Sequence, residues 1–219
     1  LRWLEKRGLP GDAVKKYRIG WTQEEIFQNR CDWGLEYEET EDGKPRQVWI
    51  PEGLVIPTID RKTKEVIRIK IRRTRWVEGD KWPKYWAISG SMNGINIIGD
   101  TSKDGMVVVE SELDSLAIDY AVGDKVFVVA VGSNIKNPDN VTNFLAKQKS
   151  ILLICYDNDE AGIKMLEKWK KFYPHAFGYP TPIGKDIGEA IEKGLDIRNW
   201  ILEGEEKVIL KTREKFNVT

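Results

Sequence analysis

The second half of the chain alternates short apolar runs with longer amphipathic segments, a pattern typical of alternating strands and helices. The apolar runs predict buried strands over residues 106–109, 126–131, 151–156 and 175–179. The segments between and after them predict helices over about 112–122, 138–148, 160–172 and 186–193. Such alternation indicates a parallel sheet with crossover helices. We therefore expect a parallel α/β domain over residues 105–194 and a helical tail over 195–219.

The first half follows a different pattern, which predicts an α+β subdomain over residues 1–104. Two short helices are expected before Tyr17, with a break at residues 8–11. Strands are expected over 54–59, 65–73 and 82–88. In the strand over 65–73, isoleucines alternate with cationic residues, so the two kinds lie on opposite faces. This half is therefore expected to be mainly antiparallel sheet with flanking helices.

The composition supports a packed core, because 219 residues with 41% hydrophobic side chains suffice for one large domain or two small ones. No apolar run approaches the roughly 20 residues that cross a bilayer, and no secretion signal is visible. We therefore expect a cytoplasmic protein without a membrane partner. Two cysteines and one histidine cannot supply the four ligands of a structural zinc site, so no zinc is expected within these residues.

Charge is unevenly distributed along the chain, although the net charge is zero. Residues 61–84 contain ten basic and three acidic side chains, whereas residues 24–52 contain nine acidic and three basic ones. A net charge of zero argues against a uniformly basic nucleic-acid-binding protein. The segment 61–84 nevertheless predicts one local basic surface.

Arg68, Lys70 and Arg72 form the cationic face of the expected strand within this basic segment. The residues expected to extend that face, and the aromatic residues interleaved with them, are Arg73, Arg75, Lys81, Lys84, Trp76, Trp82, Tyr85 and Trp86. Cations bind phosphates, and aromatic rings stack on bases with about 1–3 kcal/mol per base. This combination suits a single-stranded template or an incoming nucleotide. The alternative is a solvated polar strand face with the tryptophans in the core.

Acidic residues follow the expected strands where these end. Glu110 comes directly after the strand over 106–109, and Asp157 and Asp159 follow the strand over 151–156. Ligands bind at this edge of a parallel sheet. Acids two residues apart in extended backbone point to the same side, so Asn158 would point away from them.

Clustered carboxylates repel one another, and a divalent cation with oxygen ligands, Mg²⁺ or Mn²⁺, is the simplest compensation. Two such ions, roughly 3.5–4 Å apart, can assist phosphoryl or nucleotidyl transfer. Asp114, one helical turn beyond Glu110, and Asp186 are further candidates. The alternative is that Asp159 and Glu160 only cap the next helix.

Three motifs carry a family resemblance. The segments 109–114, 157–162 and 184–186 resemble the TOPRIM domain of DnaG-type primases, topoisomerases and several nucleases. The Asp-x-Asp-Glu-Ala-Gly form is most similar to the primases, including the phage primase–helicases. Upstream segments resemble the N-terminal subdomain of the primase core: 3–9, 17–20, 55–57, 66–72 and 83–85. The chain departs from the family pattern at two positions. Ser111 stands where the family has glycine, and Gly188 stands where many primases carry an acid. Glu189 of this chain directly follows Gly188.

The resemblance implies a DNA primase catalytic core that uses nucleoside triphosphates to synthesise short primers on single-stranded DNA. It implies Glu110, Arg72 and Lys84 as catalytic residues. The implied metal ligands, for Mg²⁺ or Mn²⁺, are Glu110, Asp114, Asp157, Asp159 and Asp186. The implied contacts to nucleic acid or nucleotide are Arg68, Lys70, Arg72, Arg73, Lys84, Tyr85 and Lys185. A replicative helicase is an expected partner through regions outside this chain.

Two other functions are open at this point. A TOPRIM nuclease would use the same ions to activate water, and a non-catalytic module would only bind nucleic acid within a replication or mobile-element complex. The segment 178–185 ends in Gly-Lys but lacks the spacing of a phosphate-binding P-loop, so no ATPase motor is expected. Gly132, Ser133 and Asn134 are expected to form either a turn or a backbone approach to phosphate.

Overall fold

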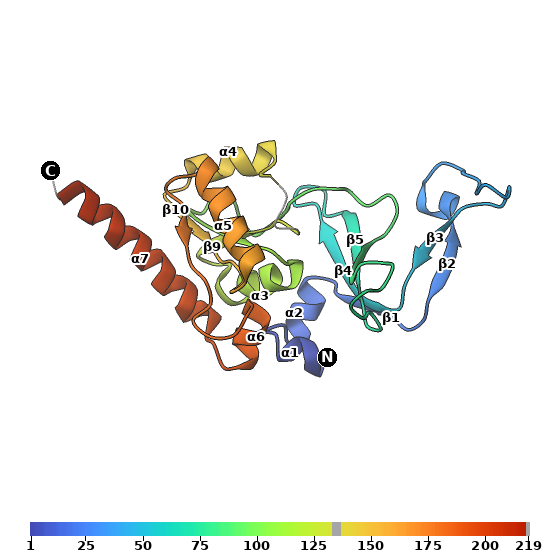
Figure 1. Ribbon diagram of the computed structural model, residues 1–219, viewed down its shortest axis with the longest axis horizontal. Helices are drawn as coiled ribbons and strands as arrows, with labels where there is room; N and C mark the ends of the chain where they lie inside the picture. Colours follow the sequence, from blue (N-terminus) through green and yellow to red (C-terminus); the bar gives the residue numbers. More distant parts are fainter. Residues whose placement is uncertain (133–136, 218–219) are drawn as a thin grey trace. The chain divides into compact units, whose positions relative to one another are not determined.

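The computed structural model describes residues 1–132 and 137–217 and places them in two compact units (Figure 1). The α/β unit contains Leu1–Ala13 and Gly94–Thr219, and the β unit contains Val14–Asn93. These units divide the chain after residues 13 and 93, whereas the sequence places boundaries at 104 and 194, which stay predictions. Ser133 and Asn134 lie outside the described residues.

The first residues join the α/β unit because they pack onto its helices. Two short helices precede the first strand: α1 (Arg2–Glu5) and α2 (Gly11–Lys16). Leu9, between them, is fully buried. Gly8 lies so close to Ile197 and Ile191 that an added Cβ would stand 3.3–3.4 Å from their Cδ1 atoms. The N-terminal segment is thus anchored by close apolar packing.

A five-stranded sheet forms the centre of the α/β unit, in the order β11–β10–β8–β9–β7. Neighbouring strands from β11 to β9 are parallel, whereas the edge strand β7 runs antiparallel to β9. The bounds are β7 (Asn96–Ile98), β8 (Gly105–Val109), β9 (Val126–Ala130), β10 (Ile151–Ile154) and β11 (Phe177–Gly178). Every residue of β8 and β9 is buried, as expected for strands covered on both faces. The predicted parallel α/β fold is confirmed.

Helices cover both faces of this sheet (Figure 1). Their bounds are α3 (Glu112–Val122), α4 (Asn140–Gln148), α5 (Glu160–Phe172), α6 (Ile187–Glu192) and α7 (Ile197–Asn217). On one face, Phe127 and Leu152 pack with Met165 and Trp169 of α5. On the other face, α3 and α7 contact each other and the sheet. No helix of the described residues combines the length and apolar character needed to cross a bilayer.

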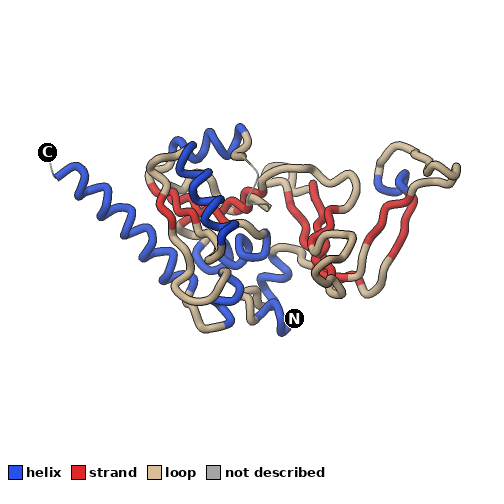
Figure 2. The backbone as a smooth tube through the Cα atoms, viewed as in Figure 1, coloured by secondary structure: helices blue, strands red, loops and turns tan. Residues whose placement is uncertain are grey.

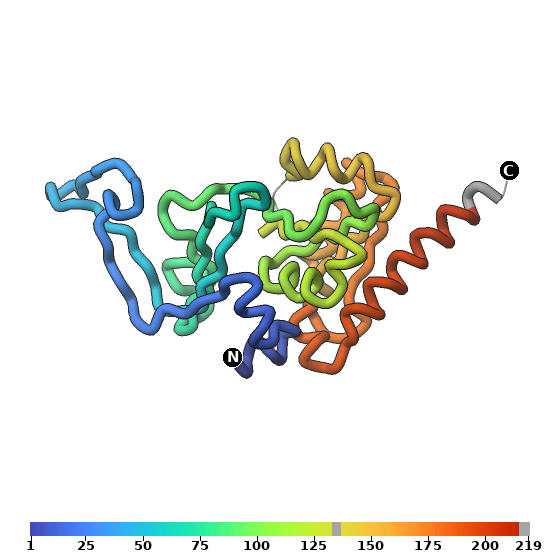
Figure 3. The backbone as a smooth tube through the Cα atoms, turned by 180° about the vertical axis from the view of Figure 1, so that it is seen from behind, coloured from blue at the N-terminus to red at the C-terminus, as the bar shows by residue number. Residues whose placement is uncertain are grey.

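The first turns of α7, the predicted helical tail, pack into the core of the α/β unit. Trp200 and Ile201 of α7 are buried, and Gly204 stands so close to the Tyr179 ring that an added Cβ would lie 2.7 Å from it. Further along, Leu210 is exposed, and α7 continues past the strands of its own unit (Figure 3).

The β unit is built from antiparallel strands, as predicted. One sheet has the order β1–β4–β5–β6, and β2 and β3 form a separate two-stranded ribbon (Figure 2). The bounds are β1 (Gly20–Thr22), β2 (Ile26–Asn29), the 3₁₀ helix η1 (Arg30–Trp33), β3 (Gln47–Ile50), β4 (Gly53–Ile59), β5 (Val66–Arg73) and β6 (Tyr85–Ala87). Its core contains Val48, Ile50, Ile71 and Ile88.

Candidate catalytic site

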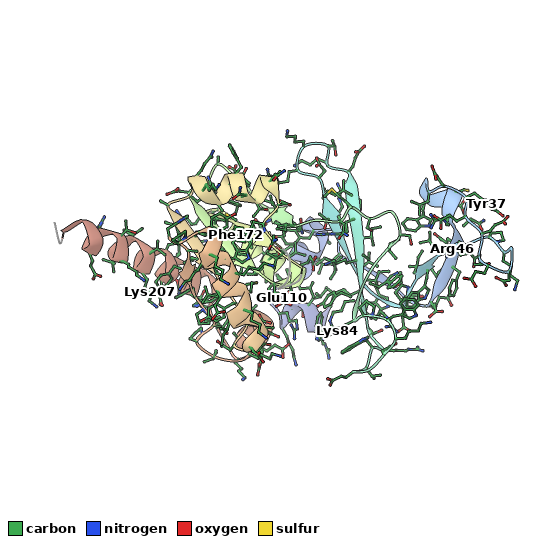
Figure 4. All side chains as sticks on the ribbon, turned by 45° about the horizontal axis from the view of Figure 1, so that its top comes forward. Tyr37, Arg46, Lys84, Glu110, Phe172 and Lys207 are labelled. Atoms are coloured by element: carbon green, nitrogen blue, oxygen red, sulfur yellow. The ribbon has the colours of Figure 1, made fainter. Side chains whose placement is uncertain are left out.

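The acids expected to meet lie at the carboxyl edge of the parallel sheet. Glu110 follows β8 directly and is half-buried (Figure 4). β10 runs parallel to β8 with Ile154 beside Val108, and the backbone N–H of Cys155 donates to the Val108 carbonyl over 2.9 Å. Asp157 therefore lies just beyond Glu110 on the neighbouring strand, as the motif spacing predicts.

Burial and mutual repulsion set the electrostatics of this edge. Burial first, and then the charges of four other acids, raise the pKa of Asp157 to about 7. These four are the rest of the predicted ligand set: Asp114, Glu110, Asp186 and Asp159. Burial and then the Asp159 charge raise the pKa of Glu110, whereas Lys185 lowers it. The structure thus brings the four other predicted ligands within electrostatic reach of Asp157.

Asp114 lies in the first turn of α3 and is buried. Ser111 caps this helix, because its hydroxyl accepts from the backbone N–H of Asp114 over 3.1 Å. The same hydroxyl donates to the Asp114 carboxylate over 2.6 Å. Burial raises the pKa of Asp114 to about 6, against the lowering effect of this hydrogen bond. Ser111 therefore supplies a helix cap where the family pattern has glycine.

Asp159 and Asp186 also cap helices. Asp159 accepts from the backbone N–H of Gly162 over 2.8 Å, and Asp186 accepts from that of Glu189 over 2.7 Å. The Gly162 N–H, and then Lys185, lower the pKa of Asp159. Asp159 therefore caps the helix, as the alternative expects, and it also lies among the clustered acids, so its role as a metal ligand stays a prediction. One of its oxygens caps α5, and the other faces Lys185.

Asn158 points away from the acids, as expected for the middle residue of the motif. Its carboxamide nitrogen donates to the carbonyl oxygens of Gly184 over 2.9 Å and Thr181 over 3.1 Å, and to the Thr181 hydroxyl over 3.2 Å. Its backbone N–H donates to the Lys185 carbonyl over 2.7 Å. One residue thus ties the Asp-Asn-Asp motif to the segment that carries Lys185 and Asp186.

Arg7 belongs to the site although its position was not predicted. Its charge lowers the pKa of Asp114, against the raising effect of burial. Its Nε lies 3.3 Å from a carboxylate oxygen of Glu192, and its guanidinium stands 4.8 Å from the Trp3 ring centroid. A Cβ at Gly188 would overlap Nη1 of Arg7. Position 188 therefore has no room for an acidic side chain while Arg7 occupies this place.

The chemistry of these residues suits a hard divalent cation, because all five predicted ligands offer carboxylate oxygens. Within the described residues, the carboxylates of Glu110 and Asp157 take part in no hydrogen bond or ion pair. Half-buried charges without a partner are costly, so a bound cation would stabilise them. As placed, no three acid, histidine or cysteine side chains in residues 1–132 and 137–217 converge on one ion position.

The cationic residues of β5 are less exposed than the sequence pattern suggests. Arg68 stands beside Thr58 of β4, is only 4% exposed, and donates from Nε to the Thr58 hydroxyl over 3.1 Å. Lys70 and Arg72 share its face of the sheet and are half-buried. Arg68 is therefore not part of an exposed surface, and its contact with nucleic acid stays a prediction.

Arg73 and Lys84 do not extend that face, because neighbouring residues on a strand point to opposite sides. Arg73 stands over the Trp49 ring at 5.4 Å and donates to the Asp80 carboxylate over 2.9 Å. The backbone N–H of Arg73 bonds the Lys84 carbonyl, which places Lys84 opposite it. The expected single cationic face is thus wrong: these residues are divided between the two faces of the sheet.

The tryptophans beside Arg73 pack against one another. The ring centroids of Trp49, Trp82 and Trp86 are 4.8–5.9 Å apart. Trp86 also packs against the core of the β unit. For Trp86, the core alternative is therefore correct, whereas Trp82 keeps 41% of its surface exposed.

Comparison with known proteins gives the same fold. Residues 107–191 match the model of the Toprim-like family, and none of the curated proteins matches the sequence. The E. coli primase catalytic core is similar with a TM-score of 0.66 at 18% identity, over 94% of this chain and 72% of that one. The DnaG primase catalytic domain bound to ssDNA has a TM-score of 0.64 at 18% identity, with the same coverage. The primase fragment of the bacteriophage T7 primase-helicase protein has a TM-score of 0.53 at 18% identity, over 91% of this chain and 71% of that one.

The five clustered acids lie inside the segment 107–191 that matches the Toprim-like family. The chain as a whole has the fold of the catalytic cores of DnaG-type and phage primases. The resemblance inferred from the motifs is confirmed.

Proposed function

We propose that this chain is the catalytic core of a DNA primase, which synthesises short primers on single-stranded DNA from nucleoside triphosphates with Mg²⁺ or Mn²⁺. The observation that carries the proposal is the group of five acids at the carboxyl edge of the parallel sheet. The fold shared with a DnaG catalytic domain bound to ssDNA supports the choice of template. Contact with a replicative helicase, through regions outside this chain, belongs to the same proposal.

In this proposal, Glu110, Asp157 and Asp159 hold the divalent ion, with Asp114 and Asp186 behind them at helix N-termini. The ion, when bound, neutralises these acids and the charge of the triphosphate. Because the Glu110 carboxylate takes part in no hydrogen bond or ion pair among the described residues, it is available to the ion and to the reacting groups beside it.

The β unit supplies most of the cationic groups of the proposal, and the α/β unit supplies Lys185. Arg72 and Lys84 neutralise phosphate charge that develops as the primer 3′-hydroxyl attacks and pyrophosphate leaves. Further contacts to template or nucleotide are assigned to Arg68, Lys70, Arg73, Tyr85 and Lys185.

The test is primer synthesis on single-stranded DNA with labelled ribonucleotides and Mg²⁺ or Mn²⁺. Asp157→Ala should lower the rate by about 100-fold or more, because it removes a carboxylate that the ion needs. Asp124→Asn is the control. It also removes one carboxylate charge, but Asp124 lies on the turn before β9, where it pairs with Arg198 and not with the acid cluster. Asp124→Asn should leave the rate within about twofold of the original.

The products of the same assay separate the other functions. Degradation of the template in place of extension would identify a Toprim nuclease that activates water. Binding of DNA without turnover would identify a non-catalytic module. Full primer synthesis by Asp157→Ala would refute the proposed metal ligands.

A further inference from the structure

Lys185 stands against the acid cluster as a cation that belongs to the chain itself. Its Nζ lies 3.2 Å from Oδ2 of Asp159, and this pair is partly exposed. Its charge also reaches beyond this partner, since it lowers the pKa of Glu110, and Asp157 and Asp186 help to raise its own pKa. One ammonium group therefore partly neutralises the same carboxylates that a divalent ion would neutralise.

The backbone of Lys185 is held in place on both sides. Its N–H donates to the Glu189 carboxylate over 2.7 Å, and its carbonyl accepts from the Asn158 N–H over 2.7 Å. The Asn158 carboxamide fixes the preceding residues through the Gly184 and Thr181 carbonyls. The fixed backbone holds the Cα of Lys185 near Asp159 and so keeps its ammonium group within reach of that carboxylate.

We propose that Lys185 is a built-in counter-cation of the acid cluster and that Asn158 positions it. In the metal-free protein the Lys185 ammonium group pairs with Asp159, and a divalent ion displaces it on binding. This inference rests on the proposed metal site but concerns the metal-free state, which the proposed function leaves undescribed. The exchange costs little, because one cation replaces another beside Asp159. Lys185 is a positioning residue in this role, because it acts on the ligands and not on the reacting atoms.

Two measurements on the nucleotide-free protein test the exchange. Lys185→Gln should tighten Mn²⁺ binding by roughly twofold to fivefold in calorimetric titration, because the ion no longer competes with the ammonium group. In thermal denaturation, Lys185→Gln should lower the melting temperature in EDTA more than in saturating Mn²⁺. The acids of this variant lack a neutralising cation only in the metal-free form. Lys185→Arg keeps the charge and should restore both values.

Lys164→Gln is the matched control. It removes the same charge and a comparable ion pair, since Lys164 lies 2.6 Å from Glu160 on the exposed side of α5. It should change neither the Mn²⁺ affinity nor the metal-induced rise in melting temperature.

Asn158→Ala tests how Lys185 is positioned. Once the carboxamide no longer fixes the segment, the lysine should spend less time beside Asp159. In the Asn158→Ala background, Lys185→Gln should therefore change Mn²⁺ affinity less than it does in the original protein. Equal effects in both backgrounds would overturn the positioning role of Asn158.

The outcomes separate this inference from the proposed function. An unchanged Mn²⁺ affinity in Lys185→Gln, or an equal loss of melting temperature with and without Mn²⁺, would overturn the counter-cation role alone. Absence of Mn²⁺ binding to the original protein would overturn both the inference and the proposed metal site. Weaker nucleotide binding by Lys185→Gln together with unchanged Mn²⁺ affinity would leave Lys185 only the nucleotide contact of the proposed function and would overturn the inference.

Discussion

The two aspartates of the Asp-Asn-Asp motif have opposite electrostatic surroundings although they are two residues apart. Burial raises the pKa of Asp157, whereas the Gly162 N–H lowers the pKa of Asp159. Asp159 is stabilised as an anion by the helix that it caps. Asp157 receives no such compensation within the described residues, so it is the acid whose charge most requires a partner from outside the chain.

This difference predicts a pH dependence of the metal-free protein. The folded-state pKa of Asp157 is about 7, above its ordinary value of 3.8, so the folded state binds a proton more tightly than the unfolded state. Stability should therefore fall as pH rises from about 4 to about 7. Asp114, with a pKa raised to about 6, contributes in the same direction. Thermal denaturation in EDTA over this range measures the fall, and Asp157→Asn should reduce it.

A carboxyl group with the opposite shift provides the control. Arg198 holds the pKa of Asp124 down at about 2, so Asp124→Asn should lower stability by a constant amount above about pH 4 and change the slope of the profile only below that pH. Saturating Mg²⁺ should raise the melting temperature more at pH 8 than at pH 5.5, since the ion needs deprotonated carboxylates. A stability profile that rises from pH 4 to pH 7 in EDTA would contradict the assignment for Asp157.

At the scale of elements, the sequence predicts long segments with a clear apolar pattern better than short ones. Helices α3 and α5 have the bounds that their segments predict, and β8 begins one residue early. The strands β1, β2, β3 and β7 were not predicted, because three or four residues show no clear period and depend on a pairing partner. Acids at strand ends could be placed from topology alone. The contacts of Arg7 and Asn158 could not, because they join segments distant in sequence.

Gly162 shows how an element boundary shapes the site. It lies in the first turn of α5, and a Cβ there would overlap the carbonyl oxygen of Asp157. Its backbone N–H also caps the helix through Asp159. The turn that presents both aspartates therefore has room for glycine only.

Gly162→Ala should accordingly destabilise the protein by about 1–3 kcal/mol, despite the better helix propensity of alanine. Urea denaturation measures the loss, and the displaced Asp157 should weaken Mn²⁺ binding as well. Gly94→Ala is the control, because a Cβ at Gly94 meets no atom within 4 Å. If both variants were equally stable, the close contact at Gly162 would not limit the turn.

At the scale of the whole molecule, a neutral total conceals separated charge within the β unit. The acidic segment 24–52 includes the β2–β3 ribbon. Two arginines of this segment form ion pairs with Glu38: Arg30 lies 2.6 Å and Arg46 3.2 Å from its carboxylate oxygens. The basic segment 61–84 keeps an excess of cations. A polyanion would be attracted to one segment and repelled by the other, so the charge distribution favours one orientation of a bound template.

This distribution predicts salt-dependent binding of single-stranded DNA, measured as log affinity against log salt concentration by fluorescence anisotropy. Arg72→Ala and Lys84→Ala should each lower affinity and reduce the slope by roughly one unit or less, because each lost phosphate contact releases one fewer counterion. Arg46→Ala removes the same charge, but Arg46 lies in the acidic segment just before β3 and pairs with Glu38, so the salt dependence of this variant should stay unchanged (Figure 4). An equal reduction by all three variants would show that only net charge matters, and the template would then have no preferred segment of the β unit.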